Sequence, residues 1–148
     1  MIDLKLLHEL HKKCAGRVKY KLGAKVPLTT DSADIKRIDC SGYSRWILAR
    51  ASNQALRMPD GSQVQLDWVR DQGWRKLAKY ADVEYAKNDG SRLFIAFLSP
   101  KPGNSWPRHV WLVRYAMTME SCGSRGVTSR PWDNVNLRGC KDCFEIPV

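Results

Sequence analysis

The stretch Ile38-Asp-Cys-Ser-Gly-Tyr43 leads into an apolar pattern with helical spacing. The pattern predicts a helix from Asp39 or Cys40 to about Ala55, with a buried face made by Tyr43, Trp46, Ile47 and Ala51. A cysteine in the first turn of a helix lies at the positive end of the helix dipole, which favours the thiolate over the thiol. Gly42 allows close backbone approach, and amides near Cys40 could stabilise an oxyanion. Taken alone, the stretch fits either a Cys40 nucleophile or a buried structural thiol equally well.

A cysteine nucleophile needs a base, which is usually a histidine. The chain has three histidines, and two of them, His8 and His11, fall in the predicted first helix. His109 opens a predicted strand and is therefore the candidate base. A third polar group must orient the imidazole, and Glu120 lies eleven residues further on, near the end of the next predicted strand. If the two strands form a hairpin, His109 and Glu120 lie side by side; otherwise Glu120 is a solvent-facing strand residue.

The remaining apolar and turn patterns predict an α+β fold. The helices are expected at residues 3–22, 39–55 and 62–72, and the strands at 92–98, 109–115, 117–121 and 143–146. Helices followed by strands favour helices packed on one side of an antiparallel sheet. The chain has no internal repeat or linker, so residues 1–148 are predicted to form a single domain.

The composition limits the classes of partner. The 148 residues carry a net charge of +10, which favours polyanions such as nucleic acid, an anionic membrane surface or bacterial cell wall. The longest apolar run, Leu93 to Leu98, is far below the roughly 18 residues of a membrane span, so stable membrane insertion is not expected. The first residues lack the apolar core of a secretory signal, which predicts folding in a cytoplasm.

The cysteine pattern predicts reduced thiols and no metal site. The five cysteines are Cys14, Cys40, Cys122, Cys140 and Cys143, an odd number that argues against a disulfide framework. Cys140 and Cys143 form a single C-x-x-C pair, and zinc would need two more ligands. His8, His11 and Cys14 drift around the predicted first helix, which indicates a helix face of mixed polarity rather than a metal site. No metal or cofactor is therefore expected.

Three segments, taken in order, resemble the NlpC-type cell-wall cysteine peptidases, which are papain-like. They are Asp39-Cys-Ser-Gly42, His109-Val-Trp-Leu-Val113 and Thr118-Met-Glu-Ser-Cys-Gly-Ser-Arg-Gly-Val127. Tyr20-Lys-Leu-Gly23 is also similar to the Tyr-x-x-Gly of that family, and the resemblance extends from about residue 15 to 132. It implies a papain-like α+β fold, with N-terminal helices packed on a small antiparallel sheet.

The resemblance also implies roles for individual residues. Cys40 would attack a carbonyl as the thiolate, His109 would accept and return the proton, and Glu120 would hold the imidazole. Tyr20, Asp39 and Ser41 would line the pocket and meet the polar ends of a stem peptide. Two positions depart from the family pattern. Trp111 replaces the usual small Gly and is expected to narrow the cleft as a bulky substrate-binding wall, and Glu120 stands where many members have His, Asn or Gln.

The implied activity is hydrolysis of an amide in bacterial peptidoglycan, between D-glutamate and the following diamino acid. The alternative within the same fold is an N-acetylmuramoyl-L-alanine amidase. In other classes, the chain would be a basic nucleic-acid-binding module, with aromatics interleaved with basic residues as in Trp68–Arg75, or an inactive phage tail protein. The favoured interpretation is a monomer that acts on peptidoglycan and not on nucleic acid. It resembles a phage endolysin, a toxin delivered by a secretion system or a phage tail-tip hydrolase.

Overall fold

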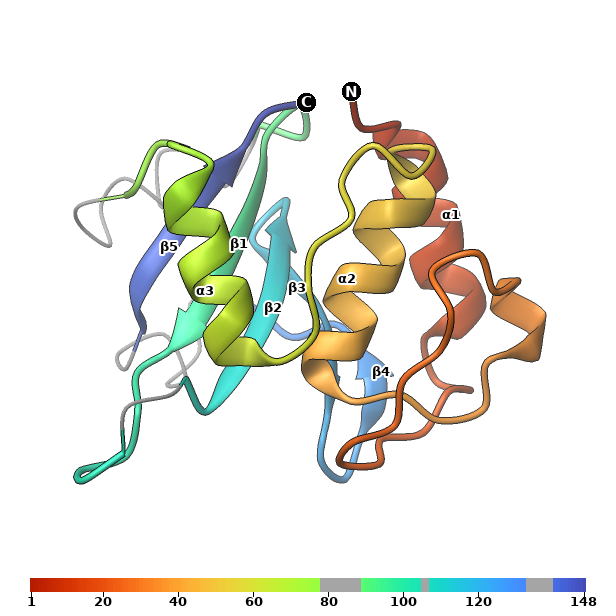
Figure 1. The fold of residues 1–148 in the computed structure, drawn as a ribbon. Helices are drawn as coiled ribbons and strands as arrows, with labels where there is room; N and C mark the ends of the chain where they lie inside the picture. Colours follow the sequence, from red (N-terminus) through yellow and green to blue (C-terminus); the bar gives the residue numbers. More distant parts are fainter. Residues whose placement is uncertain (78–88, 105–106, 133–139) are drawn as a thin grey trace.

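The computed structural model describes residues 1–77, 89–104, 107–132 and 140–148, and its elements form an α+β fold (Figure 1). The helices come first: α1 (Leu4–Cys14), the short 3-10 helix η1 (Ser32–Asp34), α2 (Cys40–Ala51) and α3 (Ser62–Asp71). The strands in the described ranges follow: β1 (Leu93–Leu98), β2 (His109–Arg114), β3 (Met117–Cys122), β4 (Gly126–Thr128) and β5 (Cys140–Ile146). They form one antiparallel sheet in the order β4-β3-β2-β1-β5. The predicted fold class is confirmed.

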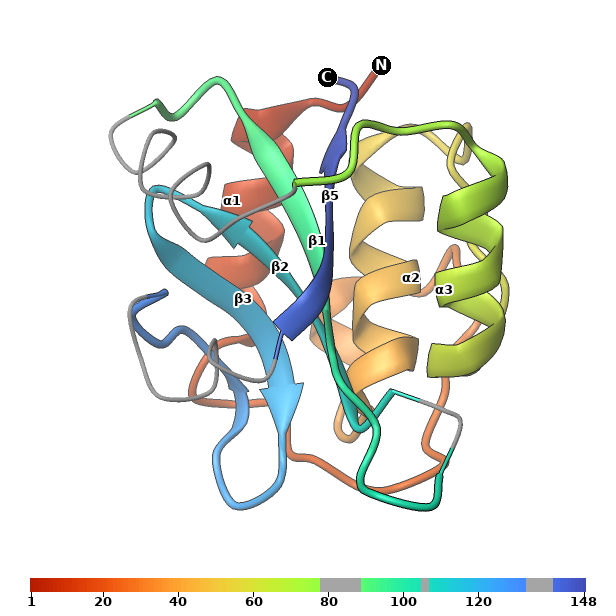
Figure 2. The same cartoon turned by 90° about the vertical axis from the view of Figure 1, so that its left-hand side faces the viewer.

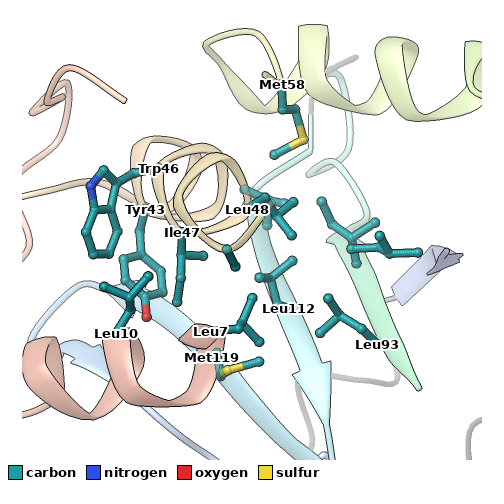
Figure 3. Packing of buried hydrophobic residues seen from close by; sticks show 14 of the residues in the cluster. Leu7, Leu10, Tyr43, Trp46, Ile47, Leu48, Met58, Leu93, Leu112 and Met119 are labelled. Atoms are coloured by element: carbon teal, nitrogen blue, oxygen red, sulfur yellow. The ribbon is translucent and has the colours of Figure 1, made fainter. Parts of the chain in front are cut away.

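Side chains alternate between the two faces of the sheet and build two apolar clusters. The larger cluster lies between the sheet and the helices, where Leu112 and Met119 meet Leu7 and Ile47 (Figure 3). The smaller cluster occupies the opposite face, toward the viewer in Figure 2, and comprises Leu77, Phe94, Ala96, Trp111, Val113, Trp132 and Cys143. The helices therefore cover one face of the sheet, as the element order predicts.

The first helix is shorter than predicted: it ends at Cys14 and not near residue 22. Gly16 has a φ of 77°, in the left-handed region that ends helices. The chain then turns toward β4: the Val18 amide donates back to the Cys14 carbonyl at 3.0 Å, the Gly16 amide donates to the Val127 carbonyl at 3.0 Å, and the Val127 amide donates to the Val18 carbonyl at 2.9 Å. Val18 is buried in this turn, which explains why its apolar side chain continues the helical pattern although the helix has ended.

Strand β4 was not predicted from the sequence. It has three residues, too few for a period-2 pattern, and it exists because β3 and the segment around Val18 supply its hydrogen-bond partners. Its register pairs Glu120 with Thr128. Strand β4 therefore runs antiparallel to β3 and lies beside Glu120.

A tight turn joins β2 to β3 and confirms the predicted hairpin. Tyr115 and Ala116 have φ values of 54° and 58°, the pair of positive angles found in a two-residue type I′ turn. The register pairs Leu112 with Met119. By continuation of that register, His109 and Glu120 share one face and lie diagonally across the two strands.

The other helix ends differ from the prediction by a few residues. Helix α2 ends at Ala51 instead of about Ala55, because Asn53 and Gln54 take positive φ angles. Helix α3 has Gly61, not Ser62, at its N-cap. Within the described ranges, the helices are too short and too polar to cross a membrane.

Candidate active site

Cys40 is the first residue of α2 and is half-buried. The preceding Asp39 is the N-cap, and its Oδ1 accepts a hydrogen bond from the Gly42 amide at 2.7 Å. A Cβ at Gly42 would lie 2.9 Å from Asp39 Oδ1 and 3.1 Å from the Ala24 carbonyl oxygen, so the close approach requires glycine. The Asp-Cys-Ser-Gly stretch therefore places the Cys40 thiol at a helix N-terminus, where the sequence predicts it.

The imidazole of His109 lies between Cys40 and Glu120. Its Nε2 is 2.9 Å from Glu120 Oε1, and the Cys40 side chain lies close enough to influence its pKa. Burial lowers the pKa of His109, but the side-chain interactions with Cys40 and Glu120 and the charges of both groups outweigh burial and raise the pKa from 6.5 to about 9. The structure thus brings together the three residues that the sequence predicted as catalytic, with a protonated imidazole between two acidic groups.

Glu120 is fully buried, with 0% of its surface exposed, so the alternative of a solvent-facing residue is wrong. Arg130 donates two hydrogen bonds to the carboxylate, from Nη2 to Oε1 at 2.5 Å and from Nε to Oε2 at 3.1 Å. The Thr118 hydroxyl also donates to Oε2. Burial raises the pKa of Glu120, but the hydrogen bonds from His109, Arg130 and Thr118 lower it from 4.5 to about 2. Glu120 is therefore a carboxylate at neutral pH.

Arg130 and Thr118 were not singled out from the sequence. The Thr118 amide donates to the Arg130 carbonyl at 2.8 Å, and the Arg130 amide donates to the Thr118 hydroxyl at 2.8 Å. This pairing follows directly from the β3–β4 ladder. A prediction of β4 would have placed Arg130 beside Thr118 and thus beside Glu120.

Asp39 and Ser41 are buried and joined by Lys25, a third residue that sequence analysis missed. The Lys25 ammonium lies 2.5 Å from Asp39 Oδ2, 2.8 Å from Ser41 Oγ and 3.0 Å from Asp60 Oδ1. These contacts tie the α2 N-terminus to the segments on either side of it in sequence. The predicted contact of Asp39 and Ser41 with substrate stays a prediction.

Tyr20 and Trp111 relate to the candidate catalytic groups in different ways. Tyr20 is half-buried, and its pKa is raised by burial and then by the negative charges of Cys40 and Asp39. Trp111 is only 2% exposed and stacks against the His109 ring. Its placement leaves little of the ring for the predicted substrate contact, whereas Tyr20 keeps an accessible surface.

His11 is the buried polar residue of a helix face that also holds the exposed His8 and the buried Cys14. Its Nδ1 lies 2.6 Å from the Tyr43 hydroxyl and its Nε2 lies 2.7 Å from Ser129 Oγ. Burial, with the positive charge of His8, lowers the pKa of His11 from 6.5 to about 4. His11 therefore ties α1 to α2 and to the residue before Arg130 as a neutral ring.

These shifts predict a free energy of unfolding that is greatest near pH 6.5. The pKa of folded His109 lies above its reference value, so its contribution is complete below pH 6.5 and is lost as pH rises through about 9. The pKa of folded His11 lies below its reference value, so the free energy of unfolding decreases as the pH is lowered from 6.5 to about 4. The depressed pKa of Glu120 decreases the free energy of unfolding further as the pH is lowered from 4.5 to about 2. Urea denaturation across this range measures the curve, and a constant value between pH 6.5 and 9 would contradict the ionised His109 pair.

The five cysteines are free thiols. Burial raises the pKa of Cys140 to about 11 and that of Cys143 well above its usual value, so both stay protonated at neutral pH. Across the described ranges, no group of three or more His, Cys, Asp or Glu side chains is arranged to hold a metal ion. Ser105 and Trp106, in the loop before β2, lie outside the described residues.

No protein-family model and no curated protein matches the sequence. Solved structures do. The P60 domain of antigen MAP1204 from M. avium subspecies paratuberculosis is 18% identical, with a TM-score of 0.59 over 96% of this chain and 93% of that one. The peptidoglycan hydrolase RipB from Mycobacterium tuberculosis is 20% identical, with a TM-score of 0.61 over 96% of this chain and 63% of that one. RipD from the same organism, a non-catalytic NlpC/p60 domain protein adapted to peptidoglycan binding, is 16% identical, with a TM-score of 0.59 over 100% of this chain and 98% of that one.

The chain has the fold of NlpC/P60 domains. This agrees with the fold that the Asp39–Gly42 and His109–Val113 segments imply. The NlpC/P60 fold includes a peptidoglycan hydrolase and a non-catalytic domain among the structures above, so the fold alone does not decide activity. The chemistry must be argued from the Cys40, His109 and Glu120 side chains.

Proposed function

We propose that this protein is a cysteine endopeptidase that cleaves the amide between D-glutamate and the following diamino acid in bacterial peptidoglycan. The observation that carries the proposal is the alignment of Cys40, His109 and Glu120 at the N-terminus of α2. The NlpC/P60 fold and the similarity to a peptidoglycan hydrolase support cell wall as the substrate. The net charge of +10 is consistent with action on an anionic wall.

The geometry supports a two-step hydrolysis. The Cys40 thiolate attacks the amide carbon, and the His109 imidazolium gives its proton to the leaving amine as the carbon–nitrogen bond breaks. Water then attacks the resulting thioester with His109 as the base, releasing the new carboxylic acid and restoring the thiol. Glu120 holds the ring through Nε2 at 2.9 Å, which leaves the other ring nitrogen to serve Cys40.

The start of α2 also supplies electrostatic stabilisation. The first amides of a helix have no intrahelical acceptor, so the Cys40 amide is suited to donate to the developing oxyanion. Asp39 already satisfies the Gly42 amide and thereby fixes the first turn. Gln65 of α3 donates to the Ser41 carbonyl at 2.8 Å and holds the same turn from the other side. The donors are thus preorganised before substrate binds.

Digestion of purified Gram-negative peptidoglycan, followed by mass spectrometry, tests the bond that is cleaved. An endopeptidase of the proposed specificity frees the amine of the diamino acid and leaves a new D-glutamate carboxylate. New sugar–lactate ends with intact stem peptides would instead indicate the amidase alternative, which uses the same three residues. New reducing sugar ends would contradict both, because glycosidases use paired carboxyl groups.

The likeness to RipD favours a second candidate, a non-catalytic domain that binds peptidoglycan. Sedimentation with insoluble wall measures binding, and the digest above measures hydrolysis on the same material. Binding without any new termini would favour this candidate. The nucleic-acid alternative predicts instead a steep salt dependence of binding to DNA or RNA in a filter assay.

The endolysin origin, the cytoplasmic location before release and the monomeric state stay predictions. Expression in a bacterium with and without a separate pore-forming protein tests the first two. Lysis that depends on the pore is the expected result, and lysis without it would contradict storage in the cytoplasm. Sedimentation equilibrium measures the oligomeric state.

A further inference from the structure

Trp111 lies directly against the candidate base. His109 and Trp111 are two residues apart on β2, so their side chains leave the same face of the sheet. Their ring centroids are 5.4 Å apart and the rings are inclined by 25°, which is a stacked arrangement. Trp111 is 2% exposed, so this stack is shielded from water.

The apolar surroundings hold the indole in one place. The ring of Trp132 meets Trp111 with centroids 6.1 Å apart at 61°, an edge-on contact. Phe94 and Val113 belong to the same buried cluster. Among the described residues, the Trp111 indole N–H has no hydrogen-bond acceptor, so van der Waals contacts rather than a polar partner fix its orientation. A side chain fixed in this way is a rigid surface for its neighbour.

The face of an indole attracts cations. The negative face of the ring stabilises a positive charge within about 6 Å of the centroid, and the effect is larger where water is excluded. A neutral imidazole gains only the stacking contact, so the stack favours the imidazolium. The charged groups that face His109 are Cys40 from α2 and Glu120 from β3, with Arg130 behind Glu120. Trp111 supplies the aromatic contact from β2 itself.

We propose that Trp111 is a positioning residue of this site: its indole face stacks on His109, fixes the plane of the imidazole and stabilises the imidazolium. The proposal rests on the proposed cysteine-peptidase function. In this proposal the buried tryptophan positions the candidate base, His109, and does not bind the substrate. Loss of the indole should therefore change turnover and the titration of His109, and leave substrate binding unaltered.

The test compares Trp111→Leu and Trp111→Phe with Phe94→Leu as the matched control. Phe94 is an equally buried aromatic residue of the same cluster, on β1. NMR titration of the histidine ring protons reports His109 without any substrate, and His109→Asn identifies its signal among the three histidines. Steady-state hydrolysis of peptidoglycan fragments across the same pH range gives kcat and KM.

In the unsubstituted protein we expect His109 to titrate near its raised pKa of about 9. Trp111→Leu is expected to lower this pKa by about one unit, to move the alkaline limb of activity by the same amount and to lower kcat about tenfold with KM unchanged. Trp111→Phe retains an aromatic face and should give about half of the pKa shift. Phe94→Leu should leave the titration of His109 in place.

A folded Trp111→Leu or Trp111→Phe protein in which His109 titrates as before would overturn the proposal, as would an equal shift in Phe94→Leu. If Trp111→Leu does not fold, Trp111→Phe decides the question. A rise in KM with kcat unchanged would return Trp111 to the substrate-binding role. Absence of hydrolysis in the unsubstituted protein would refute the proposed function, and the NMR titration would still decide the stack.

Discussion

Cys40→Ala is expected to abolish hydrolysis of purified peptidoglycan, with a loss of at least about a thousandfold in kcat. Alanine removes the only atom of this side chain that can form the thioester, and Cys40 is the thiol whose interaction raises the pKa of His109. Cys40→Ser should be nearly as inactive, because a serine hydroxyl is much harder to ionise than a thiol. Release of soluble stem-peptide fragments, quantified by mass spectrometry, measures the loss.

The fold should survive both substitutions at Cys40. The N-cap of α2 is made by Asp39 and the Gly42 amide, neither of which depends on the thiol. Circular dichroism and urea denaturation establish this. Cys140→Ser is the matched control, because Cys140 is also half-buried but begins β5, and it should retain activity. More than a trace of activity in Cys40→Ala would show that the nucleophile is another group.

Glu120→Ala is expected to damage both activity and stability. Without the carboxylate, the His109 ring loses its orienting partner, for which a loss of about ten-thousandfold in kcat is the comparable effect in serine-protease triads. The guanidinium of Arg130 also loses both hydrogen bonds to Glu120, and breaking a buried pair in this way costs about 3 kcal/mol of unfolding free energy. Urea denaturation and steady-state kinetics measure the two effects.

Glu145 offers a matched control for Glu120. It is also gripped by two cationic side chains, Arg75 at 2.7 Å and Arg92 at 2.7 Å, but it lies on β5 and is partly exposed. Glu145→Ala should cost about 1 kcal/mol and leave kcat unchanged. Equal losses of activity in the two variants would mean that Glu120 acts only through stability. Glu120→Gln adds a second test, because it preserves the shape and removes the charge that stabilises the imidazolium.

Local patterns sufficed to predict much of this molecule. The apolar spacing after Cys40 predicts α2, the short β-rich runs predict β1, β2 and β3, and the order of elements predicts the α+β class. The candidate nucleophile and base followed from chemistry, since one cysteine stands at a helix start and His109 is the histidine beyond the first helix. Each of these inferences depends on residues close together in sequence, where helix and strand periods and the helix dipole act.

The features that the sequence did not predict depend on contacts between residues distant in sequence. Val18 was assigned to the first helix, but the chain turns after Cys14, and the Val18 carbonyl accepts a hydrogen bond from the distant Val127 amide. The helical pattern assigned His11 to a face of mixed polarity but did not predict its hydrogen bonds with Tyr43 and Ser129. Burial of a polar ring depends on partners that a helical pattern does not contain. The end of α1 and the burial of His11 therefore depend on tertiary contacts.

The sequence by itself determined which groups can react: the Cys40 thiol at a helix start, the His109 imidazole and a nearby carboxylate. Only the tertiary structure decided how these groups are held. Arg130 reaches Glu120 through the short β3–β4 pairing, and Trp111 stacks on the His109 ring. The physical reason is that reactivity is a property of the side chain, whereas ionisation and orientation depend on burial and on neighbours that only the folded chain brings within contact.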